Sequence, residues 1–295
     1  MGIPTPEEIT EMTQRAKSQE LQSYADASMF QAAPMSSNGE ISVHLLAMTP
    51  DPLGAIAAAC RMYEGKPTYK LSYISPEERE HYANQVQQTH LKAPLEFVKF
   101  HFYIEGVPRD FTHQMVRQRT AVFAQESMRF AVKDNMAEEA YMPPSIEALD
   151  LESPLRQEWF DHLNDVENFY NHLIGNGIPA EDARSILPHN TTTRLHYATD
   201  LRNLSEHAGN RLCTQAQFIW RDVFSKIIDA IRDYSPEGEM LASLPFFKPV
   251  CYQVGKCPFK ADFDRGCTIR DRVDKGQFDL IDDVEWMFDE KAAWQ

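Results

Sequence analysis

Positive charge is scarce in this sequence. The 295 residues include 29 Lys and Arg against 44 Asp and Glu, which gives a formal net charge of -15 at pH 7. Binding along a nucleic-acid backbone or an anionic lipid surface needs a surplus of Lys and Arg. The sequence therefore predicts no nucleic acid polymer and no membrane as partners, and any positive site has to be local.

Long apolar runs and targeting signals are also missing. No stretch approaches the roughly 20 consecutive apolar residues that a membrane helix needs, and no basic region leads into an apolar run near the first residue. Apolar residues still make up 43% of the chain, which is enough for a substantial buried core. We expect a globular protein that stays in the cytoplasm.

Cysteine is sparse and odd in number. Because the five cysteines come without a secretory signal, a disulfide framework is not expected. The pattern Cys251-x5-Cys257-x9-Cys267 could supply thiolates to zinc, but it lacks a CxxC pair and the sequence shows no fourth ligand. We predict reduced thiols and no metal. The remaining two cysteines are Cys60 and Cys213.

Strand patterns are mixed with helix patterns, without a regular alternation of strand and helix. Residues 95–105 predict a half-buried strand, because Val98, Phe100, Phe102 and Ile104 fall on one face. This mixture favours an α+β fold over a doubly wound sheet. Further strands are expected over residues 41–48 and 191–199, and helices over residues 55–63, from Ser75, over 111–119, over 153–174 and over 200–234.

The expected helix over residues 200–234 would be the longest in the chain. Arg211 lies seven residues after Leu204 and three after Ala208, so its guanidinium should fall on the apolar stripe. Burying an arginine without a partner is costly. Arg211 is then either a snorkelling or ion-paired side chain, or a cation held ready for a ligand. The stripe comprises Leu204, Ala208, Leu212, Ala216, Ile219, Val223, Ile227 and Ala230, and it should face a core or a partner subunit.

An arginine-rich segment stands out in this acidic chain. Arg117, Arg119 and Arg129 are interleaved with glutamines and Ser127, and their fork-shaped donors suit a phosphate and the edge of a pyrimidine. The plain alternative is a solvated helix end whose arginines pair with nearby acids. On composition alone both interpretations stay open.

The order of these residues resembles a known signature. The run Arg117-Gln118-Arg119-x7-Ser127 resembles the Arg-His-Arg-x7-Ser motif of flavin-dependent thymidylate synthases, and the likeness continues through Ser127-Met128-Arg129-Phe130 and Gln114. Other segments similar to the family are residues 51–63, residues 90–96 with one insertion, residues 183–188, Thr193-Arg194, Arg202 and Arg211. The resemblance covers roughly residues 40–232.

This resemblance implies a fold and a reaction. The fold would be a single α+β domain over residues 40–248, a central and mainly antiparallel sheet flanked by long helices. Outside the resemblance, the polar residues 4–34, rich in helix formers, predict an N-terminal helical extension over residues 1–39, and residues 249–295 are expected to form a C-terminal extension. The enzyme would convert dUMP to dTMP with FAD as cofactor, methylenetetrahydrofolate as carbon donor and NADPH or NADH as reductant. The family also implies a homo-oligomer, a tetramer, with sites built from more than one chain.

The resemblance also implies roles for individual residues. Arg211 would contact the uracil ring and favour its ionised, nucleophilic form, so no attacking thiol is needed. The residues implied for dUMP are Gln114, Arg117, Gln125, Glu126, Ser127, Met128, Arg129, Arg184 and Arg211. Those implied for FAD are His90, Arg117, Gln118, Arg119, Gln125, Asp200, Arg202 and Glu206.

Three departures from the family pattern leave room for other functions. Gln118 replaces the usual central histidine of the motif, and Asp200 and Glu206 stand where members often carry Asn or His. A sister enzyme that modifies another pyrimidine nucleotide, such as dCMP, therefore stays open. So does a catalytically silent nucleotide-binding protein that kept the phosphate arginines.

Overall fold

The structure is a computed structural model that describes residues 14–15, 30–31, 40–258, 267 and 275–276. Contacts divide the chain into two compact units. Among the described residues, the first unit holds 14–15, 30–31, 40–41, 105–113 and 125–194, and the second holds 42–104, 114–124, 195–258, 267 and 275–276. Most of the expected extensions, 1–39 and 249–295, lies outside the described residues.

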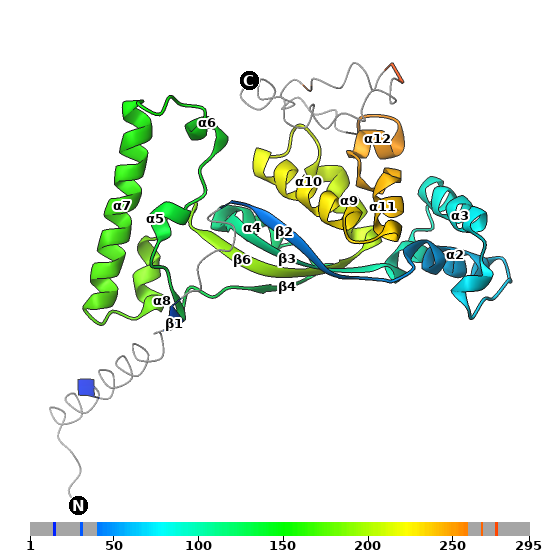
Figure 1. The fold of residues 1–295 in the computed structure, drawn as a ribbon, viewed down its shortest axis with the longest axis horizontal. Helices are drawn as coiled ribbons and strands as arrows, with labels where there is room; N and C mark the ends of the chain where they lie inside the picture. Colours follow the sequence, from blue (N-terminus) through cyan, green and yellow to red (C-terminus); the bar gives the residue numbers. More distant parts are fainter. Residues whose placement is uncertain (1–13, 16–29, 32–39, 259–266, 268–274, 277–295) are drawn as a thin grey trace, which may run out of the picture. The chain divides into compact units, whose positions relative to one another are not determined.

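A four-stranded, mainly antiparallel sheet has the strand order β2-β3-β6-β4 (Figure 1). The α+β class predicted from the sequence is therefore confirmed. A separate pair joins β1 and β5 in parallel, with Phe30 opposite Ala131. The strands are β1 Phe30–Gln31, β2 Ser42–Met48, β3 Lys99–Pro108, β4 Val122–Gln125, β5 Ala131–Val132 and β6 Thr192–Asp200.

Strand β3 shows the predicted alternation. Val98, just before it, and Phe100, Phe102 and Ile104 within it are at most 2% exposed, whereas Lys99 is exposed. The strand begins at Lys99 instead of residue 95, because residues Ala93–Phe97 form a 3-10 turn that opens on a proline. Proline fits the first turn of a helix and donates no hydrogen bond to a sheet.

Several helices of the second unit begin at side-chain caps that the sequence signals. In α2, Asp51 Oδ1 accepts a hydrogen bond from the amide of Gly54 at 2.9 Å, so the helix starts at Pro52 and not at residue 55. In α3, Ser75 Oγ accepts from the amide of Glu78 at 3.2 Å, as expected. The helices of this unit are α2 Pro52–Tyr63, α3 Pro76–Gln88, α9 Leu201–Arg211, α10 Phe218–Arg232, α11 Pro236–Ser243 and α12 Val250–Val254. Helix α10 packs on β2, as Figure 1 shows.

The single helix expected over residues 200–234 is wrong. It is two helices, α9 and α10, separated by residues 212–217. No glycine or proline marks the break, and the apolar stripe continues in phase across it, so periodicity could not show it. The break turns the chain back, and the guanidinium of Arg211 then lies 3.9 Å from the centre of the Trp220 ring. The apolar stripe expected over residues 200–234, which was to face a core or a partner subunit, is therefore not continuous along one helix.

The helix expected over residues 111–119 is also displaced. Helix α4 runs over Arg109–Met115. It ends there because the amides of Arg117 and Gln118 donate to carbonyls three residues back, Gln114 and Met115, and the chain then extends into β4. Both arginines of the signature, Arg117 and Arg119, therefore lie in a loop and not on a helix.

The first unit contains the long helix α7, Pro154–Gly175, close to the predicted 153–174. It ends at Gly175-Asn176-Gly177, where Gly177 has the positive φ of 80° that glycine adopts readily. Buried Tyr170 packs with Val132, Ala180 and Ala183 in the core of this unit. The shorter helices are α5 Met136–Glu139, α6 Pro144–Glu147 and α8 Ala180–Ala183. Among the helices of the described residues, none is long and apolar enough to span a membrane.

Candidate functional site

Three arginines gather in the first unit, two of them implied by the motifs. Arg129 donates through Nε and a terminal guanidinium nitrogen to Glu181 Oε2 at 2.9 and 2.7 Å. Arg184 donates to the backbone carbonyl of the same Glu181 at 3.1 Å. Burial first, and then the charge of Arg184, lower the pKa of the Arg109 guanidinium. Glu181 thus pairs with Arg129, while Arg184 and the Glu126 carboxylate both act on the charge of Arg109.

Arg109 is a residue that the sequence analysis missed. It opens α4 directly after Pro108, outside the motif segments, and its side chain is half-buried. A signal was present, since an arginine at a strand-to-helix turn carries a charge that a partner has to compensate. Only the fold shows that Arg184, distant in sequence, is the cation beside it.

Glu126 is engaged inside the first unit. Its Oε2 accepts from Lys133 Nζ at 2.6 Å, and its Oε1 lies 3.2 Å from Arg194 Nε. The three side chains are 12%, 4% and 18% exposed, so this is a largely buried group in which two cations lie at ion-pair distance from one carboxylate. The arrangement fixes the start of the segment that follows β4, which carries Ser127 and Arg129.

Gln125, Ser127 and Met128 occupy the same segment. Gln125 Nε2 donates to Thr112 Oγ1 at 2.9 Å, and Thr112 is fully buried. Ser127 is exposed, and its hydroxyl accepts from the amide of Arg129 at 3.4 Å. Met128 is half-buried. The structure therefore brings Ser127, Arg129 and Arg184 together in one unit, with an exposed hydroxyl beside the cations.

In the second unit, Arg211 is held against aromatic rings. Its guanidinium lies over Trp220, and its Nε donates to His207 Nε2 at 3.4 Å. Burial lowers the pKa of Arg211, although a guanidinium keeps its charge in proteins. Burial and the Arg211 charge lower the pKa of His207 to about 4, so the imidazole is neutral at pH 7. Arg211 thus ends α9 and packs on an aromatic ring of α10, where the sequence analysis placed it on the stripe of one continuous helix.

Gln114 belongs to the same cluster. Its Oε1 accepts from Trp220 Nε1 at 3.1 Å, and its Nε2 donates to Gln217 Oε1 at 2.9 Å. The indole that lies under Arg211 is therefore oriented by a residue of the motif segment. Gln114 and Arg211, assigned to one site through the resemblance, are linked through Trp220.

The three residues at the start of the signature, Arg117, Gln118 and Arg119, differ in their contacts. Gln118 is half-buried and accepts through Oε1 from the hydroxyl of Tyr197 at 3.1 Å, and burial raises the pKa of that hydroxyl. Arg117 and Arg119 are exposed. Within the described part of the chain, neither has a carboxylate at ion-pair distance. Two neighbouring cations are thus available to an anionic ligand.

Three of the other residues implied for FAD, Asp200, Arg202 and Glu206, already have charged partners. Asp200 caps α9 by accepting from the amide of Asn203 at 3.0 Å, and Lys99 lies 3.3 Å from it. Arg202 pairs with Glu96 and Glu206 at 2.6 and 3.2 Å. His90 is exposed, in the segment after α3.

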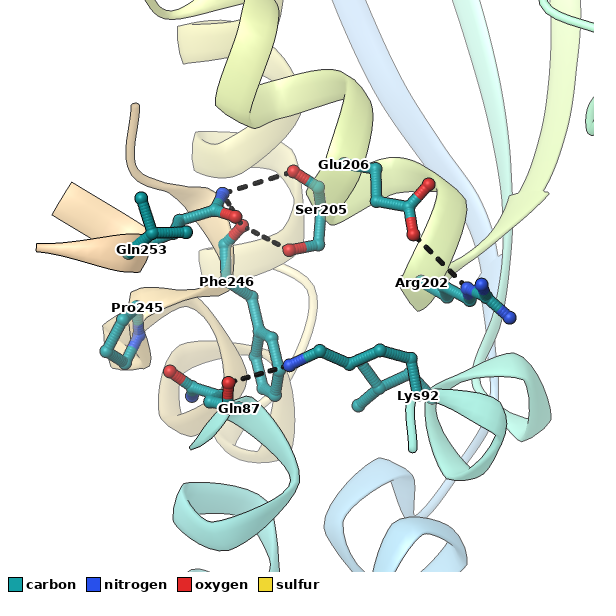
Figure 2. A pocket seen from close by; sticks show the side chains of 10 residues that line it. Gln87, Lys92, Arg202, Ser205, Glu206, Pro245, Phe246 and Gln253 are labelled. Atoms are coloured by element: carbon teal, nitrogen blue, oxygen red, sulfur yellow. Dashed lines mark hydrogen bonds and ion pairs between the residues drawn. The ribbon is translucent and has the colours of Figure 1, made fainter. Parts of the chain in front are cut away.

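Two cavities of the second unit are near these residues. The larger, of about 560 Å³, lies along the sheet and is lined by Lys99, His101, Val122 and Asp200, among others. The smaller is drawn in Figure 2, where Lys92 and Gln253 reach toward Phe246 while Glu206 points toward Arg202. Arg202 and Glu206 line the smaller cavity and Asp200 the larger, so the structure does not bring these three into one cavity.

Comparison with known proteins agrees with the motifs. The chain matches the family model of thymidylate synthase complementing proteins over residues 44–237. It is similar in fold to a crystal structure of thymidylate synthase X from Helicobacter pylori with FAD and dUMP, with a TM-score of 0.52 and 18% identity over 69% of this chain and 98% of that one. The chain thus has the fold of thymidylate synthase X, and the family model places it among the thymidylate synthase complementing proteins.

Curated relatives place it further. It is 33% identical over 237 residues to the flavin-dependent thymidylate synthase of Pyrococcus horikoshii, covering 79% of this chain and 96% of the relative. The enzyme of the same name from Pyrococcus furiosus is 31% identical over 237 residues, covering 79% and 95%. This chain belongs to the flavin-dependent thymidylate synthase family.

Proposed function

We propose that the chain converts dUMP to dTMP with FAD as cofactor, methylenetetrahydrofolate as carbon donor and NADPH or NADH as reductant. The observation that carries this proposal is that the motif arginines form two sites with different contacts. The cluster of Arg109, Arg129 and Arg184 suits a phosphate, and Arg211 on Trp220 suits a pyrimidine carbonyl.

The phosphate of dUMP would bind to the arginines of the first unit. Arg129 is 48% exposed and its carboxylate partner Glu181 is 27% exposed, so the pair can open at a modest cost. A phosphate would exchange one weak surface ion pair for several charge-assisted hydrogen bonds. Ser127 would add its hydroxyl, and Gln125, Glu126 and Met128 would shape the segment. Arg117, which lies in the second unit, is the remaining arginine that the resemblance implies for this set.

The pyrimidine would meet Arg211 and Gln114. Negative charge builds on the carbonyl oxygens when C5 becomes nucleophilic, and a fixed guanidinium stabilises that charge best when it is already oriented and partly desolvated. Stacking on Trp220 and the bond to neutral His207 hold Arg211 in one orientation. Because His207 carries no charge, it does not compete with the guanidinium for the oxygens.

The donors of the second unit suit FAD. Arg117 and Arg119 are two exposed cations for its diphosphate, and Gln118 offers an amide for its ring. Gln125 of the first unit and His90, Asp200, Arg202 and Glu206 of the second complete the proposed set, with Asp200 and Glu206 already engaged by Lys99 and Arg202. FAD supplies hydride chemistry when bound. The chain contributes orientation and charge.

We also propose a tetramer whose sites draw residues from more than one chain. The support for the tetramer is the family resemblance. The expected long helix, whose apolar stripe could have faced a partner subunit, is broken into α9 and α10 and lends no support.

Spectra and titration test the flavin and nucleotide parts. Purified protein should carry a yellow flavin chromophore whose absorption changes when dUMP is added, and Arg117→Ala with Arg119→Ala should lower flavin occupancy more than Arg232→Ala does. Arg232 is an exposed arginine paired with Asp229, distant from the motifs in sequence. Colourless protein that still binds dUMP would contradict the enzyme and support a silent nucleotide-binding protein.

A further inference from the structure

Four of the five cysteines gather in the second unit. Cys251, in α12, is 7% exposed, and Cys257 and Cys267 pack against it. The hydroxyl of Thr214 donates to Cys267 Sγ at 3.2 Å, which brings the loop after α9, and with it Cys213, to the same place. The Cys251 sulfur interacts electrostatically with all three of the other sulfurs.

The fold thus supplies the fourth ligand that the sequence pattern lacked. The full pattern reads Cys213-x37-Cys251-x5-Cys257-x9-Cys267. The distance of Cys213 along the chain hid it from a search for spaced thiols. Cys60 is the fifth cysteine and lies in α2, where Ala57, Ile74 and Tyr82 surround it.

The surroundings suit thiolates. Arg221 of α10 is 1% exposed, and its charge interacts favourably with Cys213. A cation buried beside sulfur compensates the negative charge that thiolate ligands bring. The Thr214 hydroxyl donates a hydrogen bond to the Cys267 sulfur, and such a bond can orient a sulfur that binds a metal.

The lack of a tight ligand group among the described residues favours one of two kinds of centre. Zinc bonds to sulfur at about 2.3 Å, which needs its ligands within roughly 4 Å of one another. Among the described residues, no three Cys, His, Asp or Glu side chains stand close enough around one point to hold a single ion. A cubane of four irons and four sulfides also takes four cysteines, and it separates their sulfurs more widely.

We propose that Cys213, Cys251, Cys257 and Cys267 together bind a cubane iron–sulfur cluster. A zinc ion would use the same four thiolates and is the alternative occupant of this site. The cluster would tie α12 and the segment with Cys267 to the loop between α9 and α10. Cys213 is two residues after Arg211, so the centre would also fix the end of the helix that presents the proposed pyrimidine-binding guanidinium.

Metal and sulfide analysis of the full chain tests this. The protein is purified without oxygen, as wild type and as Cys213→Ser, Cys251→Ser, Cys257→Ser and Cys267→Ser, with Cys60→Ser as the matched control. We expect about four irons and four acid-labile sulfides per chain in the wild type and in Cys60→Ser. Each of the four other substitutions should remove most of both. Flavin content is measured on the same samples, so a failed cluster and a failed enzyme are told apart.

Three results would overturn the assignment. Wild-type protein without stoichiometric iron and sulfide contradicts the cluster whatever the variants do, and this readout does not depend on whether a variant folds. Stoichiometric zinc that is lost in the same four variants would keep the thiolate site but replace its occupant. Iron that persists in Cys213→Ser and Cys251→Ser would show that these thiols are only an apolar cluster.

Discussion

At the scale of single residues, the proposed site depends on arginines that differ in how they are held. Arg129 is exposed and shares Glu181 with the backbone-bonded Arg184, whereas Arg211 is half-buried on Trp220. The sequence identified all three by their motif positions. It could not show that Glu181 competes for Arg129 or that Arg109 joins the group, because both depend on contacts between distant segments.

Arg129→Ala should weaken dUMP binding by more than ~1.5 kcal/mol, roughly tenfold, because a charge-assisted phosphate contact is lost. Arg129→Lys should recover only part of this, since an ammonium lacks the planar fork. Isothermal titration measures both. Arg232→Ala is the control, because Arg232 is equally exposed at 48% and also paired with a carboxylate. Unchanged affinity in Arg129→Ala would refute the phosphate assignment.

Glu181→Gln tests the competition in the opposite direction. Removing the carboxylate that now holds Arg129 leaves the guanidinium available and removes a negative charge near the proposed phosphate. The dUMP affinity should rise, most clearly at low salt where surface charges are least screened. An affinity lowered by this substitution would mean that Glu181 orients Arg129 for the ligand.

His207 should make stability depend on pH. Its pKa of about 4 in the folded protein lies below the unfolded value of about 6.5, so the unfolded state binds the proton first. The free energy of unfolding is then at its full value above pH 6.5 and falls as the pH drops toward 4, by on the order of 3 kcal/mol. Denaturant titrations across this range should show the loss, and His207→Gln should remove most of it. Exposed His162→Gln should not.

At the scale of elements, local signals and long-range contacts account for different parts of the fold. The cap at Ser75, the alternation in β3 and the glycines after α7 were readable because each is fixed by neighbours in sequence. The break between α9 and α10 was not, because it carries no helix breaker. It is accompanied by contacts that only the folded chain makes, such as Arg211 on Trp220.

Gly106 tests one such close approach. A Cβ at this position would lie 2.0 Å from the carbonyl oxygen of Glu40, and the φ of 74° is unfavourable for other residues. Gly106→Ala should lower the free energy of unfolding by more than about 2 kcal/mol. Gly65→Ala is the matched control, since Gly65 has a φ of 70° but nothing within 4 Å. Equal losses in thermal or denaturant unfolding would show that only the backbone angle matters.

At the scale of the whole molecule, Arg129 and Arg211 belong to different compact units. In a tetramer with shared sites, the two arginines of one site can come from different chains. Mixing Arg129→Ala with Arg211→Ala under conditions of subunit exchange should then restore activity, because some sites carry neither substitution. Light scattering provides the control. A strictly monomeric protein that still turned over dUMP would defeat the shared site.

The most direct test of the central claim is formation of dTMP by the purified chain. With methylenetetrahydrofolate, NADPH or NADH and FAD present, we predict that dUMP is converted to dTMP and that dCMP is not methylated. Arg211→Ala should reduce kcat by at least about tenfold while the protein keeps its flavin, since a fixed positive charge is lost where negative charge develops. Flavin-bound wild-type protein that yields no dTMP, or that modifies dCMP in preference to dUMP, would contradict the account.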